Sequence, residues 1–325
     1  MIITQAPLRI SFVGGGTDLP DFYRKYGGAV ISTAIDKYLF VIVKERFDEK
    51  IYLNWMKKEI VDSVDEIEHE LIREAMKKTK VLRGVEITTL SDIPAEGSGL
   101  GSSSSLTVAL LHALYLYQGI LVDVERLAKE ACEIEIEILK KPIGKQDQYI
   151  AGYGGLKHFE FKKDGKVIVT APEITEKSFH YLDSCLLLFY TGKTRSSSEI
   201  LTEQKKKITD TSQILGKMRD QSFSLKDSLK TGRIDDLGKE LALGWEYKKQ
   251  LSQRISNGEI DQMYERALKA GAAGGKIAGA GGGGFLLLFV PPENQTKVRQ
   301  FLSGYQELNF HLERDGTKAI FNIRR

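Results

Sequence analysis

The chain has 325 residues, of which 42% are hydrophobic, so it can bury a substantial core and is long enough that two domains are the natural expectation. A formal net charge of +3 is too small to indicate nucleic acid as a partner. No apolar run approaches the roughly 20 residues that cross a bilayer, and the N-terminus lacks a charged-then-apolar leader. These features argue against a membrane partner and favour a cytoplasmic location.

The first part of the chain is rich in predicted strands. Residues 2–13, 29–44 and 85–90 have β-forming patterns, and a helix is expected over 63–78. The first strand carries Arg9 and ends in three consecutive glycines, which are followed by Thr17 and Asp18. This turn therefore places a cation and a carboxylate close to a flexible backbone.

A glycine and serine loop at 94–105 runs directly into a predicted helix over 104–118. Leu106, Leu110, Ala113, Leu114 and Tyr117 fall at three- and four-residue spacing, which predicts one buried helix face. The free N–H groups and the positive end of the dipole at a helix start can bind a polyphosphate. The glycines let the backbone approach phosphate oxygens, and serine hydroxyls can donate to phosphate or bind Mg²⁺. A serine-capped helix after a plain turn is the alternative.

A third helix is predicted over 124–139, although the alternation of glutamate and isoleucine at 133–138 also resembles a strand. Leu127, Ala131, Ile134 and Ile138 keep helical spacing, which favours the helix. A hairpin is expected over 154–169, with its turn at 163–165.

The second half is predicted to begin near Phe179, which gives domains 1–178 and 179–325. A strand over 185–190 is followed by a charged helical stretch over 196–253, and a helix over 261–272 precedes a glycine run and a strand over 285–290. The lysines at 205–207 and 248–249 have the pattern of solvated helix faces. Cys132 and Cys185 are expected to be buried, reduced thiols.

Two glycine motifs are excluded by their surroundings. A Walker loop needs glycine five residues before its Gly-Lys-Thr, and the sequence has Leu187 at that place before Gly192. The run 279–284 has the letters of a dinucleotide fingerprint, but that fingerprint follows a strand and opens a helix. Here the predicted order is helix, glycines, strand, so a Rossmann fold is not indicated.

Three segments in this order, 7–18, 94–105 and 276–284, resemble the three motifs of the GHMP kinases, the family named for galactokinase, homoserine kinase, mevalonate kinase and phosphomevalonate kinase. The resemblance covers nearly the whole chain. It implies an α+β fold with two domains, a first unit like ribosomal protein S5 domain 2 and a second that is ferredoxin-like. It also implies an ATP-dependent small-molecule kinase that uses Mg²⁺.

The resemblance implies roles for particular residues. Asp147 matches the family's base and Arg9 the cation beside it. A carboxylate next to an acceptor hydroxyl can take its proton as the O–P bond forms, and a nearby cation keeps the carboxylate ionised. The implied nucleotide-binding residues are Gly97, Gly99, Leu100, Gly101, Ser102, Ser103 and Ser104.

For the metal, family members use a serine of the second motif and a helix glutamate seven residues before a proline. These positions are Ser103 and Glu135, because Pro142 follows at the required distance. Mg²⁺ held by two protein oxygens together with phosphates and water is normal for a kinase. Glu133 and Glu137 are expected to face solvent, although a shift of two residues in helix register would exchange these roles.

Substrate specificity is indicated by the Gly-Gly-Gly-Thr-Asp-Leu-Pro segment at 14–20 and by the segment 142–149. Both look most like the sugar 1-kinases that act on heptose 7-phosphate, which implies a small-molecule sugar phosphate as partner. A fucokinase or another hexose 1-kinase of the family is the alternative. The substrate-binding residues expected on this basis are Gly16, Thr17, Asp18, Lys193, Arg195, Gly281 and Gly282, with Lys193 and Arg195 for the distal phosphate and Arg24 and Lys25 as second candidates.

Two other classes of function were weighed. A binding protein of the same fold without catalysis could dispense with Asp147, Glu135 and Ser103, yet all three are present. A metal-dependent hydrolase would need clustered histidines or carboxylates, and the five histidines are scattered along the chain. The sequence leaves the oligomeric state open.

Overall fold

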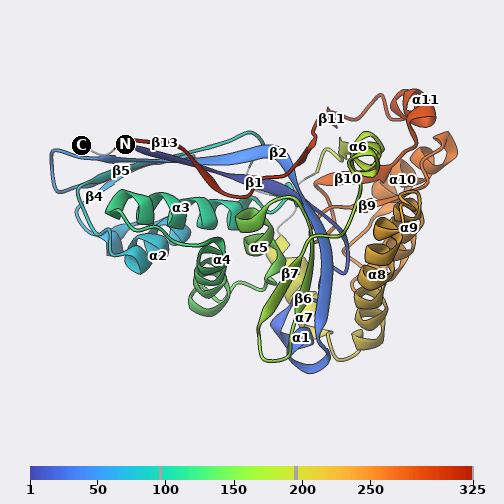
Figure 1. Ribbon diagram of the computed structural model, residues 1–325, viewed down its shortest axis with the longest axis horizontal. Helices are drawn as coiled ribbons and strands as arrows, with labels where there is room; N and C mark the ends of the chain where they lie inside the picture. The colour runs from blue at the N-terminus through green and yellow to red at the C-terminus, as the bar shows by residue number, and fades with distance from the viewer. Residues whose placement is uncertain (95–96, 194–196, 324–325) are drawn as a thin grey trace.

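The computed structural model describes residues 1–94, 97–193 and 197–323. Within these residues the strands form one nine-stranded and one four-stranded sheet (Figure 1). The strands are β1 (Ile2–Val13), β2 (Gly28–Glu45), β3 (Ile51–Asn54), β4 (Lys58–Val61), β5 (Val85–Ser91), β6 (Leu156–Phe161), β7 (Val167–Thr170), β8 (Leu186–Tyr190), β9 (Gly274–Ile277), β10 (Phe285–Phe289), β11 (Glu307–Leu308), β12 (Leu312–Glu313) and β13 (Lys318–Asn322). The α-helices are α1 (Pro20–Tyr26), α2 (Glu70–Thr79), α3 (Ser102–Gln118), α4 (Val124–Cys132), α5 (Gln146–Tyr153), α6 (Glu176–Ser184), α7 (Ser197–Lys206), α8 (Ser212–Lys230), α9 (Asp236–Lys249), α10 (Gly258–Ala270) and α11 (Gln295–Phe301).

The larger sheet has the order β13-β1-β2-β5-β3-β4, and β6 and β12 also pair with β2. The 18 residues of β2 make this possible, because its first part pairs with β6 and its last part with β5. The register of β1 against β2 shifts between Pro7 and Leu8. A proline has no N–H to donate, so a bulge is where a strand within a sheet tolerates it. Arg9 follows this bulge directly.

Helices α2 to α5 lie along one side of the larger sheet, with α3 in contact with β1 and β2 (Figure 1). The smaller sheet, β11-β8-β10-β9, is antiparallel throughout, and α9 packs on β9. A core cluster joins the two sheets through Leu8 and Ile10 of β1 and Leu188 and Leu287 of the smaller sheet. The arrangement is the mixed α and β fold of the two-domain family proposed from sequence.

The chain does not divide simply at one point. Strands β12 and β13, at its end, return to pair with β2 and β1. The boundary predicted between residues 178 and 179 falls within α6, and the division into 1–178 and 179–325 stays a prediction. Among the described residues, the helices are all too short or too polar to span a membrane.

Most predicted elements are confirmed, including β1, β2, β5, α3, β8, β10 and the β6–β7 hairpin. The helix expected over 63–78 is partly wrong, because its α-helical part begins at Glu70. The elements that were not predicted are the strands β3, β4, β9 and β11 to β13 and the helices α1, α5, α6 and α11. The glycine run therefore joins the strands β9 and β10, and since no helix follows it, the dinucleotide fingerprint stays excluded.

The choice of helix over strand for 124–139 is confirmed, but the second part, η2 (Glu133–Ile138), is a π-helix. Leu127, Ala131 and Ile134 are buried as expected, whereas Ile138 is exposed. A π-helix has a wider turn than an α-helix, so it changes which side chains share a face. This explains why the sequence signal there was mixed.

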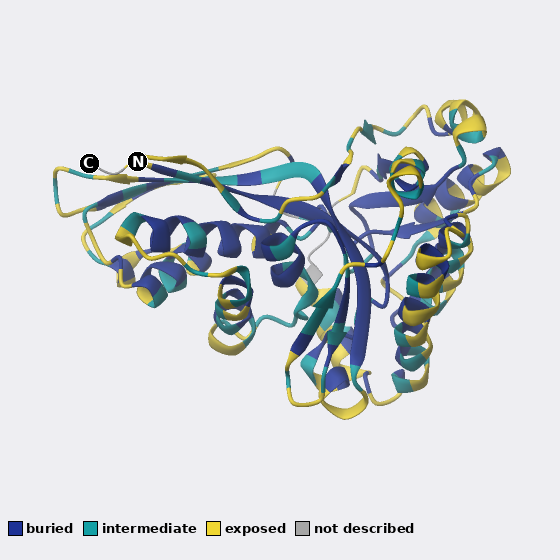
Figure 2. Ribbon diagram, in the orientation of Figure 1, coloured by how far each residue is buried: buried dark blue, intermediate teal, exposed yellow. Residues whose placement is uncertain are grey.

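Two predictions about burial are wrong. Helix α3 is buried on nearly every side rather than on one face, because it lies between the sheet and α2, α4 and α5 (Figure 2). Lys248 is buried, with 6% of its surface exposed, although its position predicted a solvated face. The other lysines of that prediction, at 205–207, are exposed. Cys132 and Cys185 are free and buried, as expected.

Candidate active site

The bulged strand β1 and helix α5 place Arg9 and Asp147 in direct contact. Nε and one terminal nitrogen of Arg9 donate to Oδ1 and Oδ2 of Asp147 at 2.8 and 2.7 Å. The other terminal nitrogen donates to the carbonyl of Gly99 at 2.6 Å. Such a two-point contact fixes the plane of the carboxylate. Arg9 is 4% exposed, while the Asp147 side chain is 23% exposed and so remains accessible to a small molecule.

The glycine and serine loop brings the start of α3 to this pair. The N-cap of α3 is Gly101, and a Cβ there would lie 3.1 Å from Cγ of Arg9 and 3.5 Å from Oδ2 of Asp147. The free N–H groups and the positive dipole end of a 17-residue helix therefore lie beside the accessible carboxylate. An anion at the helix start would be next to any group that Asp147 contacts.

The remaining loop residues differ in exposure. The side chain of Leu100 is fully buried, and its carbonyl accepts from the N–H of Arg9 at 2.9 Å. Ser105 donates to the carbonyl of Pro7 at 2.8 Å, which fastens α3 to β1. Ser102 and Ser104 are buried, whereas Ser103 is exposed. The N–H of Leu100 also donates to the hydroxyl of Ser98 at 3.3 Å, so both main-chain groups of Leu100 already have partners within the chain.

The third predicted motif packs directly on this loop. A Cβ on Gly99 would lie 2.6 Å from the carbonyl oxygen of Ala278, and one on Gly279 would lie 2.6 Å from Cα of Gly99. No side chain fits between two backbones at this distance, so glycine is required on both sides. The loops at 97–101 and 278–284 thus form one layer.

Glu135 of η2 lies against the first turn of α3 and is fully buried. Its Oε2 accepts from the hydroxyls of Ser104 at 3.1 Å and Ser103 at 3.4 Å, and its Oε1 accepts from the side chain of Gln148 at 3.3 Å. Burial raises its pKa to about 7. By contrast, Glu133 forms an ion pair with Lys78 at 2.6 Å and Glu137 is exposed.

This arrangement fits a divalent cation. The hydrogen bonds that Glu135 accepts come from neutral groups, and the nearby charge of Lys141 only partly offsets the effect of burial on its pKa, so a cation at this carboxylate would be stabilising. Among the described residues no group of three or more His, Cys, Asp or Glu could hold a metal ion. A kinase Mg²⁺ does not require one, because phosphates and water complete its shell. The metal roles of Ser103 and Glu135 stay predictions.

The predicted sugar-binding residues fall into two groups. Asp18 lies near the Arg9–Asp147 pair, and its Oδ1 accepts from the N–H of Gly16 at 2.9 Å and its Oδ2 from that of Gln146 at 3.2 Å. Burial, together with the nearby charge of Asp147, raises the pKa of Asp18. The hydroxyl of Thr17 is instead engaged with the carbonyls of Gly14 and Ala29 and is fully buried. Thr17 closes the turn and offers no free hydroxyl, so we do not retain it as a substrate ligand.

The residues predicted for the distal phosphate are less well placed. The ammonium of Lys193 forms an ion pair with Glu259 of α10 at 2.6 Å, and Arg195 lies outside the described residues. The N–H of Gly282 already donates to the carbonyl of Ile255 at 2.8 Å, and a Cβ on Gly281 would meet the same residue at 3.0 Å. The amide of Gly282 is therefore not free for a substrate.

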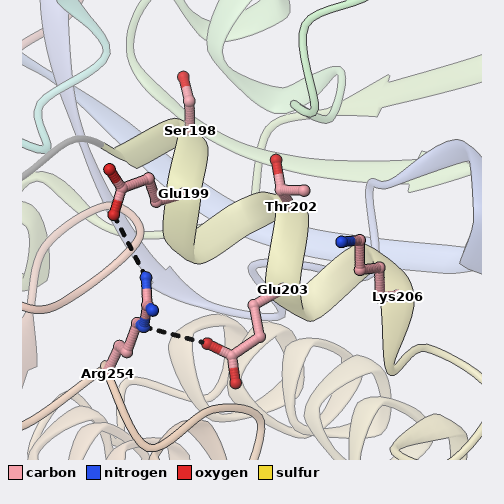
Figure 3. Close-up of a pocket in the computed structure, with 6 residues that line it drawn as sticks. All are labelled: Ser198, Glu199, Thr202, Glu203, Lys206 and Arg254. Atoms are coloured by element: carbon pink, nitrogen blue, oxygen red, sulfur yellow. Dashed lines mark hydrogen bonds and ion pairs between the residues drawn. The ribbon is translucent and has the colours of Figure 1, made fainter.

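A separate pocket of about 440 Å³ lies along α7. Its lining includes one side of α7, with Ser198, Thr202 and Lys206. Arg254 lies between Glu199 and Glu203 and pairs with both (Figure 3). None of the predicted site residues that the structure describes lines it. With two carboxylates already paired to one guanidinium, it is poorly suited to a phosphate.

Sequence reasoning missed two positions beside the site. The main chain of Gln146 supports Asp18, and the side chain of Gln148 supports Glu135. Both lie in the segment 142–149, which was selected for its likeness to sugar kinases, so their proximity to Asp147 was the available signal. A further residue that sequence reasoning missed is Lys248, and no signal in the sequence points to it.

Comparison with known proteins gives the family of this chain. Residues 57–155 match the family model for the GHMP kinases N terminal domain, and residues 225–307 match that for GHMP kinases C terminal. D-glycero-alpha-D-manno-heptose 7-phosphate kinase of Campylobacter jejuni is 31% identical over 98% of both chains. L-fucokinase/L-fucose-1-P guanylyltransferase of Bacteroides fragilis is 26% identical over 92% of this chain and 36% of that longer protein.

Among solved structures, a D-glycero-D-manno-heptose 1-phosphate kinase from Bacteriodes thetaiotaomicron superposes with a TM-score of 0.83, at 25% identity over the whole of both chains. The chain belongs to the GHMP kinase family. It is an ATP-dependent phosphotransferase, and within that family it is a sugar kinase.

Proposed function

We propose that this kinase phosphorylates the anomeric hydroxyl, O1, of D-glycero-D-manno-heptose 7-phosphate and forms the 1,7-bisphosphate. The observation that carries the proposal is the contact of the Arg9–Asp147 pair with the start of α3, because it puts a fixed carboxylate beside a phosphate-binding helix end. The choice of sugar rests on the relative with 31% identity over nearly the full length of both chains, whose name gives this substrate.

In the proposed mechanism the phosphates of ATP bind the N–H groups of the loop 97–104 and the first turn of α3. Asp147 accepts the proton of the sugar hydroxyl while that oxygen attacks the γ-phosphorus, and ADP leaves with the electrons of the broken P–O bond. Arg9 holds the carboxylate in place and, as a guanidinium, remains charged throughout. Ser103 and Glu135 would hold Mg²⁺, which neutralises charge on the phosphates when bound.

Asp18 is proposed to orient the sugar. Each of its carboxylate oxygens accepts one main-chain hydrogen bond, which leaves acceptor capacity for sugar hydroxyls. Of the two residues predicted for the distal phosphate, Lys193 is the one that the structure describes. To bind this phosphate, Lys193 would have to break its ion pair with Glu259.

A substrate panel tests the assignment. With ATP, we expect turnover of the heptose 7-phosphate to exceed that of mannose, galactose, fucose and mevalonate, and ³¹P NMR of the product to show a new anomeric phosphate. The position of the new phosphate has to be measured directly, because the names of two relatives differ. One names a heptose 7-phosphate and the other a heptose 1-phosphate. Preference for free fucose would favour the fucokinase alternative, which the second relative supports.

The distal phosphate can be tested separately. Lys193→Ala should lower kcat/KM for the heptose phosphate by about tenfold or more, as expected for a charge-assisted hydrogen bond, and leave a non-phosphorylated sugar nearly unaffected. Glu259→Ala is the matched variant, because it removes the competing partner and keeps the lysine. Equal losses with both kinds of sugar would exclude Lys193 from the phosphate site.

A further inference from the structure

Two buried lysines lie behind the glycine layer, and the mechanism above does not use them. Lys248 comes from the last turn of α9 and Lys276 from β9, and each is 6% exposed. Within the part of the chain that the structure describes, neither forms an ion pair with a carboxylate. Burying an ammonium group without a counter-charge is expensive, so these two positions call for an explanation.

Each lysine is bonded to main-chain carbonyls in a glycine loop of the site or at the end of the strand that leads into one. Nζ of Lys248 donates to the carbonyl of Ile277 at 3.0 Å and to that of Gly279. Nζ of Lys276 donates to the carbonyls of Ser11 at 2.9 Å and Phe12 at 3.0 Å, immediately before the turn that leads to Asp18. The lysines thus fasten α9 to the third motif, and the third motif to the first.

Arg9 extends this series by one further contact. It donates to the carbonyl of Gly99 in the phosphate loop as well as to Asp147. Gly279, which Lys248 holds, packs against Gly99 from the other side. Three cations therefore hold all three glycine loops, and each does so through carbonyl oxygens.

The charges in this region do not balance. Arg9 faces it from β1, Lys276 from β9 and Lys248 from α9, while Asp147 of α5 pairs with Arg9. Burial, and to a smaller extent the charge of Arg9, lowers the pKa of Lys276 to about 7. Burial, with Lys276 and Arg9 nearby, holds the pKa of Lys248 well below its usual range. When both lysines are protonated, this region holds more positive than negative charge, and a polyphosphate would neutralise the excess.

We propose that Lys248 and Lys276 are positioning residues for phosphoryl transfer, which fix the three glycine loops around the phosphates and have the phosphates of ATP as their counter-charge. The proposal rests on the use of ATP by this family and does not depend on which sugar is the acceptor. Its electrostatic consequence is that binding of ATP favours the protonated lysines. Nucleotide binding should therefore take up protons.

Kinetics provide the first test. Lys248→Met and Lys276→Met should each lower kcat about tenfold or more, because misplaced loops lose the aligned geometry. The matched control is Lys249→Met, next to Lys248 on the same helix but paired with Glu246, and it should change kcat less than about twofold. Activity within twofold of wild type for both Lys248→Met and Lys276→Met would overturn the proposal.

Calorimetry gives a readout that a purely structural role would not change. A non-hydrolysable ATP analogue with Mg²⁺ is titrated without sugar at about pH 7.5, in two buffers of different ionisation enthalpy. The wild-type protein and Lys249→Met should take up on the order of half a proton per site more than Lys276→Met does. Equal uptake in wild type and Lys276→Met would overturn the counter-charge role.

Lys276→Arg covers the case in which Lys276→Met does not fold. An arginine keeps the charge and the donors, yet its pKa is too high for it to release a proton at this pH. It should bind the nucleotide analogue with the reduced proton uptake expected for the methionine variant. Uptake as large as in wild type would again contradict the proposal. Because no sugar is present, failure of this test is distinct from failure of the heptose assignment.

Discussion

The two sides of the loop 97–104 carry charged side chains of opposite sign, most of them buried. On the side of α5 and η2 lie the carboxylates of Asp18, Glu135 and Asp147, which accept hydrogen bonds from amides, hydroxyls and Arg9. On the side of α9 and β9 lie Lys248 and Lys276, which donate to carbonyls. Main-chain and neutral groups satisfy most of the hydrogen bonds on both sides, so charge is left uncompensated on each.

Because of this difference, we expect the two sides to have different roles in catalysis. A carboxylate with an open lone pair can accept a proton or a metal ion, so the acidic side can perform chemistry. An ammonium whose hydrogens point at carbonyls is held in place, so the basic side can position loops and supply a field. In the proposed mechanism the pair of Mg²⁺ and ATP brings both missing counter-charges at once.

The largest effect is expected on the acidic side. Asp147→Asn should lower kcat by roughly 10²–10⁴-fold, because the amide cannot accept the sugar proton, while the helix start proposed to bind ATP is unchanged. Steady-state kinetics and calorimetric titration with nucleotide together check this. Loss of ATP affinity with kcat preserved would mean that Asp147 has a different role.

The metal-binding role of Glu135 predicts a smaller, more specific effect. Glu135→Gln should raise the Mg²⁺ concentration for half-maximal rate by about tenfold or more, because the amide is a poorer ligand for this cation. A rate measurement over a series of Mg²⁺ concentrations detects the change.

Glu133→Gln is the control on the same helix, since Glu133 pairs with Lys78 on the surface. It should leave the Mg²⁺ requirement unchanged. If both variants shift it equally, the effect comes from helix stability or from a different register of η2.

The acidic side could be predicted from sequence to a much greater extent than the basic one. The loop 97–104 could be recognised from its glycines and serines before a helix, and Arg9 and Asp147 from their likeness to family motifs, and the structure brings them together. The contact between Glu135 and the serines required a choice of helix register that the π-helix could have altered. Motif likeness, rather than periodicity, selected Glu135, which does contact these serines, and its metal role stays a prediction.

Lys248 shows why the rest could not be predicted. Its neighbours Lys249 and Gln250 are polar, so the local pattern indicates a surface. Its burial arises from packing of α9 on β9, a strand that the sequence analysis did not identify. Thr17 is a related case. Its hydroxyl could have bound a sugar, but it donates to the carbonyls of Gly14 and Ala29, which come near it only in the folded turn.

The smallest predicted effect concerns stability on the basic side. An unfolded lysine has a pKa near 10.4, and that of Lys276 in the folded protein is about 7. Between these values the unfolded state binds more protons, so raising the pH favours the folded state. The cost of burying this ammonium is fully present below about pH 7 and declines as the pH rises toward 10.

Lys276→Met should remove this contribution. Between about pH 7 and 9, Tm of the apo protein should rise by roughly 1–3 °C less in Lys276→Met than in wild type, as measured by calorimetry against a common buffer series. Other groups titrate in both proteins, so the difference between the two slopes isolates Lys276, with Arg9 and Lys248 as the charges that face it. Lys249→Met should keep the wild-type slope. A steeper rise of Tm with pH in Lys276→Met than in wild type would mean that the buried ammonium stabilises the apo protein. The charge of Lys276 would then not be uncompensated in the absence of nucleotide.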